Sequence, residues 1–488
     1  MTINRRRFLE RGAMAGGALA ALGPFHALGA SGSNGRSFQS EGYGPLMRKG
    51  ALWLPIDFNY QVLSVQGTVM SDGRPTPGIF DGMAAFPGTD GGTILIRNHE
   101  NRERAGEQKV ITDPCHDYDP LATGGVTKLE ISRQRAGKDS VTGQQLYSYN
   151  VIRDFAILSG TSTNCGGGIR HPHTWITCEE VVKRSTNGIK HGYIFEVDAR
   201  SDRALPAIPV CQAGRRAHEA AAERAGIIYM TEDRSISPDP VAARRLIGSC
   251  FYRYRPAPSA TPLASTNGPL EALKLRNEFQ ANMDEGRVVG APYPVEWVAV
   301  DEPDHDDDTD DRRDRAPGHT PNRIQAQDRG AAFFDRLEGM WIGNGEGKIY
   351  FTATAGGVRK LGQVWEYDPG REIITLIYES TDSARLQNPD NIVVVPSTQD
   401  ILICEDGPGN QCIRGVTQEG EIFDFARTTA NRTEFCGACF APDGQTLYLN
   451  QQGQRGSLPR GPQDGGAVTY AIYGPFEKRR SGLKKYLW

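Results

Sequence analysis

Short runs of alternating apolar and polar residues recur along the chain, separated by clusters of Gly, Pro, Asn and Asp. Two such runs are GGVTKLEIS, which begins at Gly124, and GQVWEYDP, which begins at Gly362. Alternation with a period of two is typical of β-strands that bury one face. The pattern therefore predicts an all-β protein built from many short strands.

A longer segment recurs about six times, and each copy carries an acidic or thiol side chain at matched ends of a predicted strand. The copies occupy residues 81–100, 165–180, 219–233, 338–354, 390–406 and 436–451. A single unit of this kind cannot bury both of its faces, so the copies should close into a radial array. We predict a six-bladed β-propeller in which each copy forms the inner part of one blade. A two-sheet sandwich is the alternative, but it does not explain acidic residues at equivalent strand ends.

The copies are unevenly spaced, so the loops between the strands must carry insertions. The largest insertion spans residues 256–330 and contains LEALKLRNEFQANM, from Leu270 to Met283. Leu270, Leu273 and Phe279 fall on overlapping faces of a helix there, which predicts a partly helical insertion. An acidic run at residues 301–315 follows, without the Gly and terminal Glu of an EF-hand. We interpret this run as a solvated segment and not as a metal site.

The N-terminus has the features of a twin-arginine export signal. Arg5, Arg6 and Arg7 precede Phe8 and Leu9, then come an apolar Ala/Gly-rich stretch and small residues near Ala30. We predict a signal peptide at residues 1–30, recognised by the twin-arginine translocase, and a single propeller domain at residues 31–488. The mature protein should be periplasmic or secreted. An ordinary basic N-terminal helix is the alternative.

Charge and cysteine content narrow the possible functions. The formal net charge of −4 argues against a nucleic-acid partner. Nine cysteines leave at least one unpaired in an exported chain. We expect Cys165 to be the free thiolate, with Cys404–Cys412 or Cys436–Cys439 as candidate structural pairs. A disulfide between Cys165 and Cys178 remains an alternative, and we expect a monomer.

The matched strand ends supply the candidate chemistry. If the copies surround one channel, the acidic and thiol groups converge there, and such crowding requires cations or protons. Many oxygen ligands suit Ca²⁺, and one thiolate among carboxylates suits iron. The alternative for each residue is a carboxylate that caps a neighbouring loop. The copies begin with Asp81, Cys165, Glu219, Glu338, Asp390 and Cys436, and the far ends offer Glu100, Glu179, Glu180, Glu232, Asp233, Glu405 and Asp406.

Three further side chains are candidates for supporting roles. Arg336 lies two positions before Glu338, so both point to the same side of an extended segment. A guanidinium beside a metal cluster can clamp a phosphate oxygen, although a structural salt bridge is the alternative. His99 and His218 precede Glu100 and Glu219, and they could orient these ligands by hydrogen bonds.

Several motifs in the same order resemble the PhoX-type bacterial alkaline phosphatases, which are calcium- and iron-dependent propeller enzymes exported by the twin-arginine route. The resemblance spans about residues 52–452, and it implies hydrolysis of phosphomonoesters by a cluster of Fe³⁺ and Ca²⁺. By the same resemblance, Cys165, Glu180, Glu219 and Glu338 bind or bridge iron, and Arg336 contacts phosphate. It also implies calcium ligands at Glu232, Asp233, Asp390, Glu405 and Asp406. The most specific motifs are TNCGGG with TWITCEE, HEAA with YMTEDR, RLEGMWIG with GKIYFTATAGG, NPDNIVVVP with ILICEDG, and GACFAPDGQTLYLN.

The chain departs from that family at one place. Many members carry Pro-Trp-Gly-Thr between the cysteine and TCEE, whereas this chain has Arg170, His171, Pro172, His173 and Thr174. We expect these side chains to lie beside the cluster and to alter its substrate or metal preference. Two other functions stay open: a calcium-dependent lactonase or ester hydrolase, and a non-catalytic calcium-binding propeller that binds a periplasmic partner.

Overall fold

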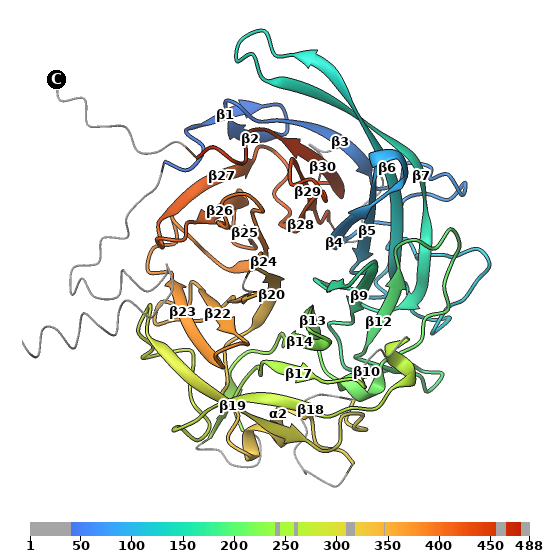
Figure 1. Cartoon of the computed structure of the whole chain (residues 1–488). Coiled ribbons are helices and arrows are strands. Elements are labelled where there is room, and N and C mark those ends of the chain that lie inside the picture. Colours follow the sequence, from blue (N-terminus) through green and yellow to red (C-terminus); the bar gives the residue numbers. More distant parts are fainter. Residues whose placement is uncertain are drawn as a thin grey trace, which may run out of the picture.

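Six blades of β-strands surround a central channel in the computed structural model (Figure 1). The structure describes residues 41–239, 245–257, 262–308, 318–345, 347–454 and 465–479. The prediction of an all-β propeller is confirmed. The predicted signal peptide lies outside the described residues. Among the described residues, no helix is long and apolar enough to cross a membrane.

Each blade follows one of the six copies, and its strands are antiparallel and run outward from the channel in chain order. The first blade contains β4 (Phe80–Pro87), β5 (Thr93–His99), β6 (Gly124–Lys138) and β7 (Gln145–Thr161). The second contains β8 (Gly168–Arg170), β9 (Thr174–Cys178) and β12 (Ile194–Asp198). The third contains β13 (His218–Arg224), β14 (Ile227–Glu232), β17 (Tyr252–Tyr254) and β18 (Leu270–Leu275).

The remaining blades repeat this arrangement. The fourth contains β20 (Leu337–Ile342), β21 (Ile349–Ala353), β22 (Gln363–Asp368) and β23 (Ile373–Glu379). The fifth contains β24 (Pro389–Val394), β25 (Ile401–Glu405), β26 (Cys412–Val416) and β27 (Ile422–Thr428). The sixth contains β28 (Phe435–Phe440), β29 (Thr446–Gln451) and β30 (Val468–Tyr473).

The N-terminal part of the chain closes the ring. Strand β3 (Asn59–Val65) is the outer strand of the sixth blade, where it pairs with β30. Strands β1 (Leu46–Lys49) and β2 (Leu52–Pro55) extend the fifth blade by pairing β2 with β27. The first and last parts of the described chain therefore share two blades. Opposite ends of the sequence hold each other in place.

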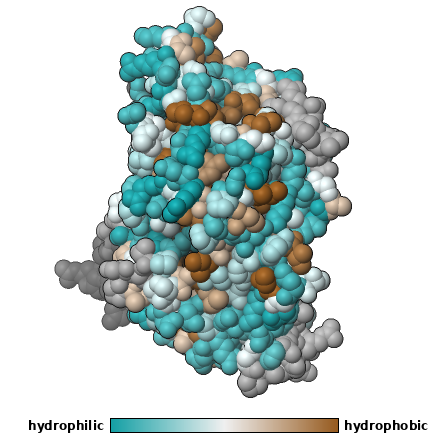
Figure 2. Space-filling model, turned by 90° about the vertical axis from the view of Figure 1, so that its right-hand side faces the viewer, coloured by the Kyte–Doolittle hydropathy of each residue, from teal (hydrophilic) through white to brown (hydrophobic). Residues whose placement is uncertain are grey.

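The core lies between the faces of neighbouring blades. Phe251, Phe351 and Trp365 fill the space between the third and fourth blades, and all three are fully buried. Leu402, Phe425 and Leu449 belong to a second cluster, between the fifth and sixth blades. The flank in Figure 2 is mainly hydrophilic, with hydrophobic residues in small scattered groups. Burial is thus concentrated between blades, which fixes the inner strands around the channel.

The predicted helix at Leu270–Met283 is wrong. Its first half is strand β18, which pairs with β17 on one side and with β19 (Pro292–Val300) on the other. Strand β19 also pairs with β23, so it joins the third and fourth blades into one nine-stranded sheet. Phe279, expected on the buried face of the helix, is 66% exposed. Sheet pairing at the blade edge has overridden the local helix preference of this Leu-rich segment.

Helical structure in the insertion is limited to short elements within its described part. The α-helix is α2 (Asn322–Asp328), and a 3₁₀ turn covers Leu263–Ser265. Elsewhere, 3₁₀ turns cover Thr89–Gly91 and Cys211–Ala213. Two small hairpins pair β10 (Lys183–Arg184) with β11 (Lys190–His191) and β15 (Ser237–Pro238) with β16 (Leu246–Ile247).

The expectation of a solvated acidic run holds only in part, because Asp301, Asp304 and Asp306 are exposed but the described part of the run also makes ion pairs. Asp304 and Asp306 form ion pairs with Lys190 at 3.1 and 2.7 Å, and Asp308 pairs with Arg215 at 2.7 Å. His305 is fully buried, so this portion packs against the second blade. The charges repel one another less here because each has a basic partner.

The predicted disulfides are also wrong, since all nine cysteines are free. Cys404 lies opposite Ile413, not Cys412, in the pairing of β25 with β26. Cys436 faces Asn450 across the sixth blade, while Cys439 pairs with Tyr448. Cys165 and Cys178 are both buried without a bridge. The expectation that Cys165 is a free thiol is confirmed.

Glycines narrow the channel at its waist. An added Cβ on Gly82, in the first blade, would lie 1.8 Å from the carbonyl oxygen of Gly166 in the second. Only about 10 Å³ of free space remains among Gly82, Gly166, Gly339 and neighbouring residues of the inner strands. The inner strands can approach this closely only because these side chains are absent.

Replacing Gly82 by alanine should therefore destabilise the fold. We expect Gly82→Ala to lower the free energy of unfolding by about 1–3 kcal/mol or more, because backbone must move to admit the methyl group. Urea denaturation followed by tryptophan fluorescence measures this. Gly370→Ala is the control: its Cβ would lie 3.4 Å from the nearest atom. Equal stability of the two variants would show that the waist is not tightly packed.

Candidate metal centre

The inner strands place one side chain each into the same end of the channel. In every blade, pairing with the second strand begins at one residue, and the channel residue is the next one along the chain. The residues at which pairing begins are Phe80, Asn164, His218, Leu337, Pro389 and Phe435. A register irregularity follows immediately in five of the six blades. Such bulges redirect side chains near functional sites. The channel residues are Asp81, Cys165, Glu219, Glu338, Asp390 and Cys436.

The second strands supply a further ring of residues at the same end. Each residue donates its backbone N–H to the carbonyl of the residue two positions before the channel residue, at 2.8–3.2 Å. In four blades that acceptor residue has a left-handed backbone, with φ of 48–57° at Ile79, Thr163, Arg336 and Asn388. Strained backbone of this kind clusters at functional sites. The second ring comprises Glu100, Glu180, Asp233, Thr354, Asp406 and Gln452.

Adjacent carboxylates on the second strands point in opposite directions, because side chains alternate along a strand. Glu180, Asp233 and Asp406 reach the channel, whereas the residue before each of them is turned into its own blade. Glu232 accepts hydrogen bonds from the N–H of Cys250 at 3.0 Å and from the hydroxyl of Tyr252 at 2.9 Å. Glu405 accepts from the N–H of Gln387 at 2.9 Å and pairs with Arg414.

Four overlapping groups of side chains could each hold a metal ion. Within each group, the ligand atoms lie within 4.8 Å of one another. Neighbouring groups share Glu180, Glu338 and Asp390 in turn, so the groups form a continuous arc along the channel mouth. The four groups are Glu100–Cys165–Glu180, Glu180–Asp233–Glu338, Glu219–Glu338–Asp390 and Asp390–Asp406–Glu434.

Seven of the nine predicted metal ligands belong to this arc, but Glu232 and Glu405 do not. Glu100 and Glu434 are additional members. Glu100 ends one of the repeated segments, so the repeat already marked its position. Glu434 precedes β28 at the position that Arg336 has in the fourth blade, and only an alignment of the inner strand starts reveals this equivalence.

Burial and mutual repulsion perturb the acidity of these groups. Burial, followed by the neighbouring carboxylates, raises the pKa of Asp81, Glu180, Glu219, Glu338 and Glu434 well above the ordinary range. Burial and the nearby Asp406 raise the pKa of Asp390 to about 7. Burial and Asp81 also raise the pKa of the Cys165 thiol. A bound cation would reverse these shifts by favouring the charged forms.

Two oxygen atoms of the site lack the partners that burial demands. Asp81 Oδ1 and Glu219 Oε2 are buried without a hydrogen bond among the described residues. An unpaired buried carboxylate oxygen costs free energy comparable to a lost hydrogen bond. A cation would supply the missing partner of such oxygens, so the residues present fit a metal cluster.

Two arginines lie among the carboxylates. Arg336 donates from Nε and Nη2 to Asp233, both at 3.0 Å, and Nη2 also contacts Glu338 at 2.5 Å. Arg102 contacts Glu100 and, at 2.8 Å, Glu180. Their side chains are 32% and 34% exposed, respectively. Both guanidiniums therefore border the open side of the site.

The two histidines do not orient the ligands, contrary to our expectation. His99 lies 2.9 Å from the carbonyl of Gly78 and 2.9 Å from the hydroxyl of Thr127. His218 Nε2 lies 2.9 Å from the carbonyl of Gly214. Burial lowers the pKa of both rings, which keeps them neutral. They turn away from Glu100 and Glu219 because they precede them on alternating strands.

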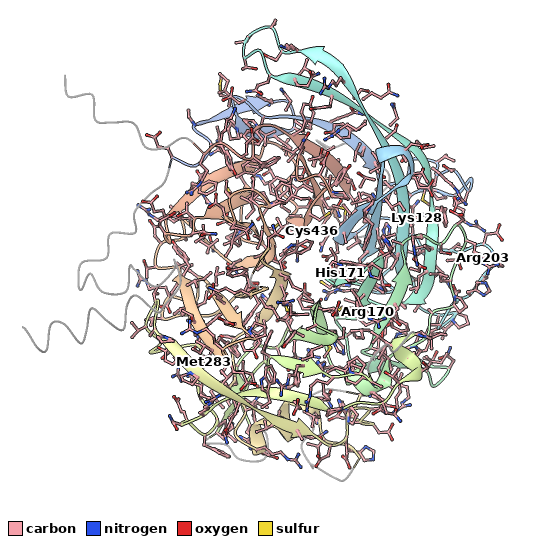
Figure 3. All side chains as sticks on the ribbon, in the orientation of Figure 1. Lys128, Arg170, His171, Arg203, Met283 and Cys436 are labelled. Carbon is pink, nitrogen blue, oxygen red and sulfur yellow. The ribbon has the colours of Figure 1, made fainter. Side chains whose placement is uncertain are left out.

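The segment from Arg170 to Thr174 does not lie beside the acidic site, contrary to our expectation. It joins the end of β8 to the start of β9, and the inner strands run from the acidic end to the opposite end of the channel. His171 lines a cavity of about 680 Å³ there, together with Arg224 and Trp341. Figure 3 shows Arg170 and His171 near the centre of the ring in the view along the channel. The glycine waist separates this cavity from the carboxylates.

Comparison with known proteins decides the family. The model of the family described as "Alkaline phosphatase PhoX" matches residues 41–454. The chain belongs to this family. It is therefore a metal-dependent phosphatase that acts on phosphate esters. No curated protein sequence matches the chain.

One solved structure of a PhoX protein agrees with the family on the fold. The chain is similar to PhoX of Pseudomonas fluorescens in complex with vanadate, with a TM-score of 0.62 and 15% identity, covering 90% of this chain and 98% of that one. The WD40 propeller domain of Doa1 matches with a TM-score of 0.35 and 9% identity, over 84% of this chain and 97% of that one. A putative 6-phosphogluconolactonase from Bacteroides uniformis matches with a TM-score of 0.36 and 11% identity, over 83% of this chain and 95% of that one.

Stability of the metal-free protein should depend on pH. The raised pKa of Asp390 means that the folded protein keeps a proton that the unfolded chain releases between about pH 4 and 7. The free energy of unfolding should therefore fall as pH rises through this window, and the other raised carboxyls act in the same direction.

Thermal unfolding of chelator-treated protein from pH 4.5 to 8 measures this effect. Saturating Ca²⁺ should restore stability at pH 8, because a cation favours the ionised carboxylates. A metal-free Tm that rises with pH would contradict the arrangement of the carboxylates.

Proposed function

We propose that this phosphatase hydrolyses phosphate monoesters at a polynuclear site formed by the arc of four ligand groups. The observation that carries the proposal is the sharing of Glu180, Glu338 and Asp390 between neighbouring groups. A shared carboxylate has two oxygens and can bridge two cations. Cations held close together can neutralise several phosphoryl oxygens at once. One isolated calcium site would not need this sharing.

The ligand types suggest which ions occupy the arc. Cys165 contributes a thiolate to the first group, and a thiolate among carboxylates suits Fe³⁺. Glu100 and Glu180 share this group with Cys165, and the family resemblance adds Glu219 and Glu338 as further iron ligands. The other groups contain only oxygen ligands, which suit Ca²⁺. We therefore infer Asp233, Asp390, Asp406 and Glu434 as calcium ligands.

Glu232 and Glu405 have a different role in this proposal. Both are buried and accept hydrogen bonds from backbone N–H groups of their own blades. They hold the second strand against neighbouring segments and so position Asp233 and Asp406, which follow them. We infer that they support the ligands without binding metal themselves.

The protein residues bind and orient the ester. Arg336 is fixed by Asp233 and Glu338, so its guanidinium is already aligned when the phosphoryl group arrives. Its charge persists across the physiological range and opposes the negative charge of the transition state. The metal cluster supplies electrostatic stabilisation and an activated oxygen nucleophile when bound. The glycine waist closes the channel behind the site, so the ester enters from the acidic end.

We also propose that the enzyme works outside the cytoplasm as a monomer. The proposal is supported by the twin-arginine pattern before residue 31. A folded cargo suits a cluster whose ligands come from five of the six repeated segments and from Glu434, which lies just before the sixth.

Replacing the thiol tests the iron assignment. Cys165→Ala should remove iron and any violet ferric-thiolate absorption while the protein keeps bound calcium, as measured by elemental analysis. Hydrolysis of an aryl phosphate should fall about 100-fold or more. Cys439→Ala is the matched control, because Cys439 is also buried but belongs to none of the four groups. Calcium without iron in the wild-type protein, with lactone turnover and no phosphatase activity, would favour a lactonase instead.

Removing the guanidinium tests the role of Arg336. Arg336→Ala should lower kcat/KM for an aryl phosphate about 10²–10³-fold, because a charged donor to the transition state is lost. Steady-state kinetics at constant metal content measure this. Arg336→Lys should recover only part of the loss, since lysine cannot donate in a fork. Full activity of Arg336→Ala would contradict a role in phosphate binding and would mean that Arg336 only forms a structural salt bridge.

A further inference from the structure

A second arginine occupies a position similar to that of Arg336 at the mouth of the site. Arg102 follows the first blade's Glu100 by two residues, and its Nε lies 2.6 Å from Glu100 Oε1. Its Nη2 lies 2.8 Å from Glu180 Oε2 in the second blade. The guanidinium thus spans two neighbouring blades. The Arg102 guanidinium has no role in the proposed binding of the cations.

The two arginines flank the same group of ligands. Arg336 spans the third and fourth blades through Asp233 and Glu338, as Arg102 spans the first and second. Glu180 and Asp233 belong to one group whose ligand oxygens lie within 4.8 Å of each other. The side chains therefore follow one another in the order Arg102, Glu180, Asp233, Arg336. An anion above this group has a guanidinium on each side.

Both arginines retain donors for a ligand. Each uses Nε and Nη2 for its contacts with carboxylates. Within the described part of the chain, the Nη1 group of neither arginine makes a hydrogen bond. About one third of each side chain is exposed. Two partly exposed guanidiniums with free N–H groups form a site for an anion with several terminal oxygens.

We propose that Arg102 is the second half of a two-arginine clamp, which contacts one terminal oxygen of the phosphoryl group while Arg336 contacts another. The proposal rests on the proposed function and defines its substrate class. A phosphate monoester has three terminal oxygens, which serve both arginines and the cations between them. A diester has only two and carries less charge. The clamp therefore favours monoesters over diesters.

The test compares Arg102→Gln with the wild-type metal-loaded enzyme. KM for an aryl phosphate monoester and the Kd of inorganic phosphate, measured by calorimetry, should both rise about 10- to 100-fold, as expected for one lost charge-assisted hydrogen bond. The ratio of monoesterase to diesterase activity should fall. Iron and calcium contents should stay at the wild-type values. Arg102→Lys should give intermediate constants.

Arg104→Gln is the matched control, because it removes the same charge from an exposed position of the same loop. It should leave the Kd of phosphate unchanged. An unchanged Kd in Arg102→Gln would overturn the clamp, and so would a loss of metal that accounts for the whole change. If the wild-type enzyme lacks phosphatase activity, the proposed function fails, while phosphate binding by the two variants still decides the role of Arg102.

Discussion

Repulsion among buried carboxylates is the constraint on which the rest of the structure depends. The four ligand groups alone bring eight carboxylates and one thiol to the mouth of a channel that the strands cannot widen. Two arginines offset only part of this charge. In water these groups would separate, but the cores between blades hold the inner strands in place. The energy released by packing thus maintains an arrangement that the charges alone oppose, and cations resolve the conflict.

Much of this site could be predicted from the repeat. The position of an acidic or thiol residue at the start of each copy correctly located Cys165, Glu219, Glu338 and Asp390 in one ring. The prediction succeeded because a closed radial array carries equivalent positions to equivalent places. The prediction required no knowledge of the loop conformations. Features that do not repeat between blades could not be predicted in this way.

The features that the repeat did not predict share physical causes. Side-chain alternation sends adjacent residues to opposite faces, which separates Glu232 from Asp233 and Glu405 from Asp406. The leucine spacing after Leu270 predicts a helix, but β17 and β19 flank this segment and pair with it as a strand. Arg170 is close to Cys165 in the sequence, but β8 runs along the channel and carries the two residues toward opposite ends of it. In each case tertiary context decided the outcome.

Closure of the ring by β3 has a consequence for how the protein matures. The sixth blade needs a strand from near residue 60 and three strands from beyond residue 430. Glu100 and Glu434 therefore belong to one site only after almost the entire chain has been synthesised. Contacts so distant in sequence form late and slowly. The complete set of candidate metal ligands is thus a property of the finished molecule, and loading of the proposed cluster would report that folding has reached its end.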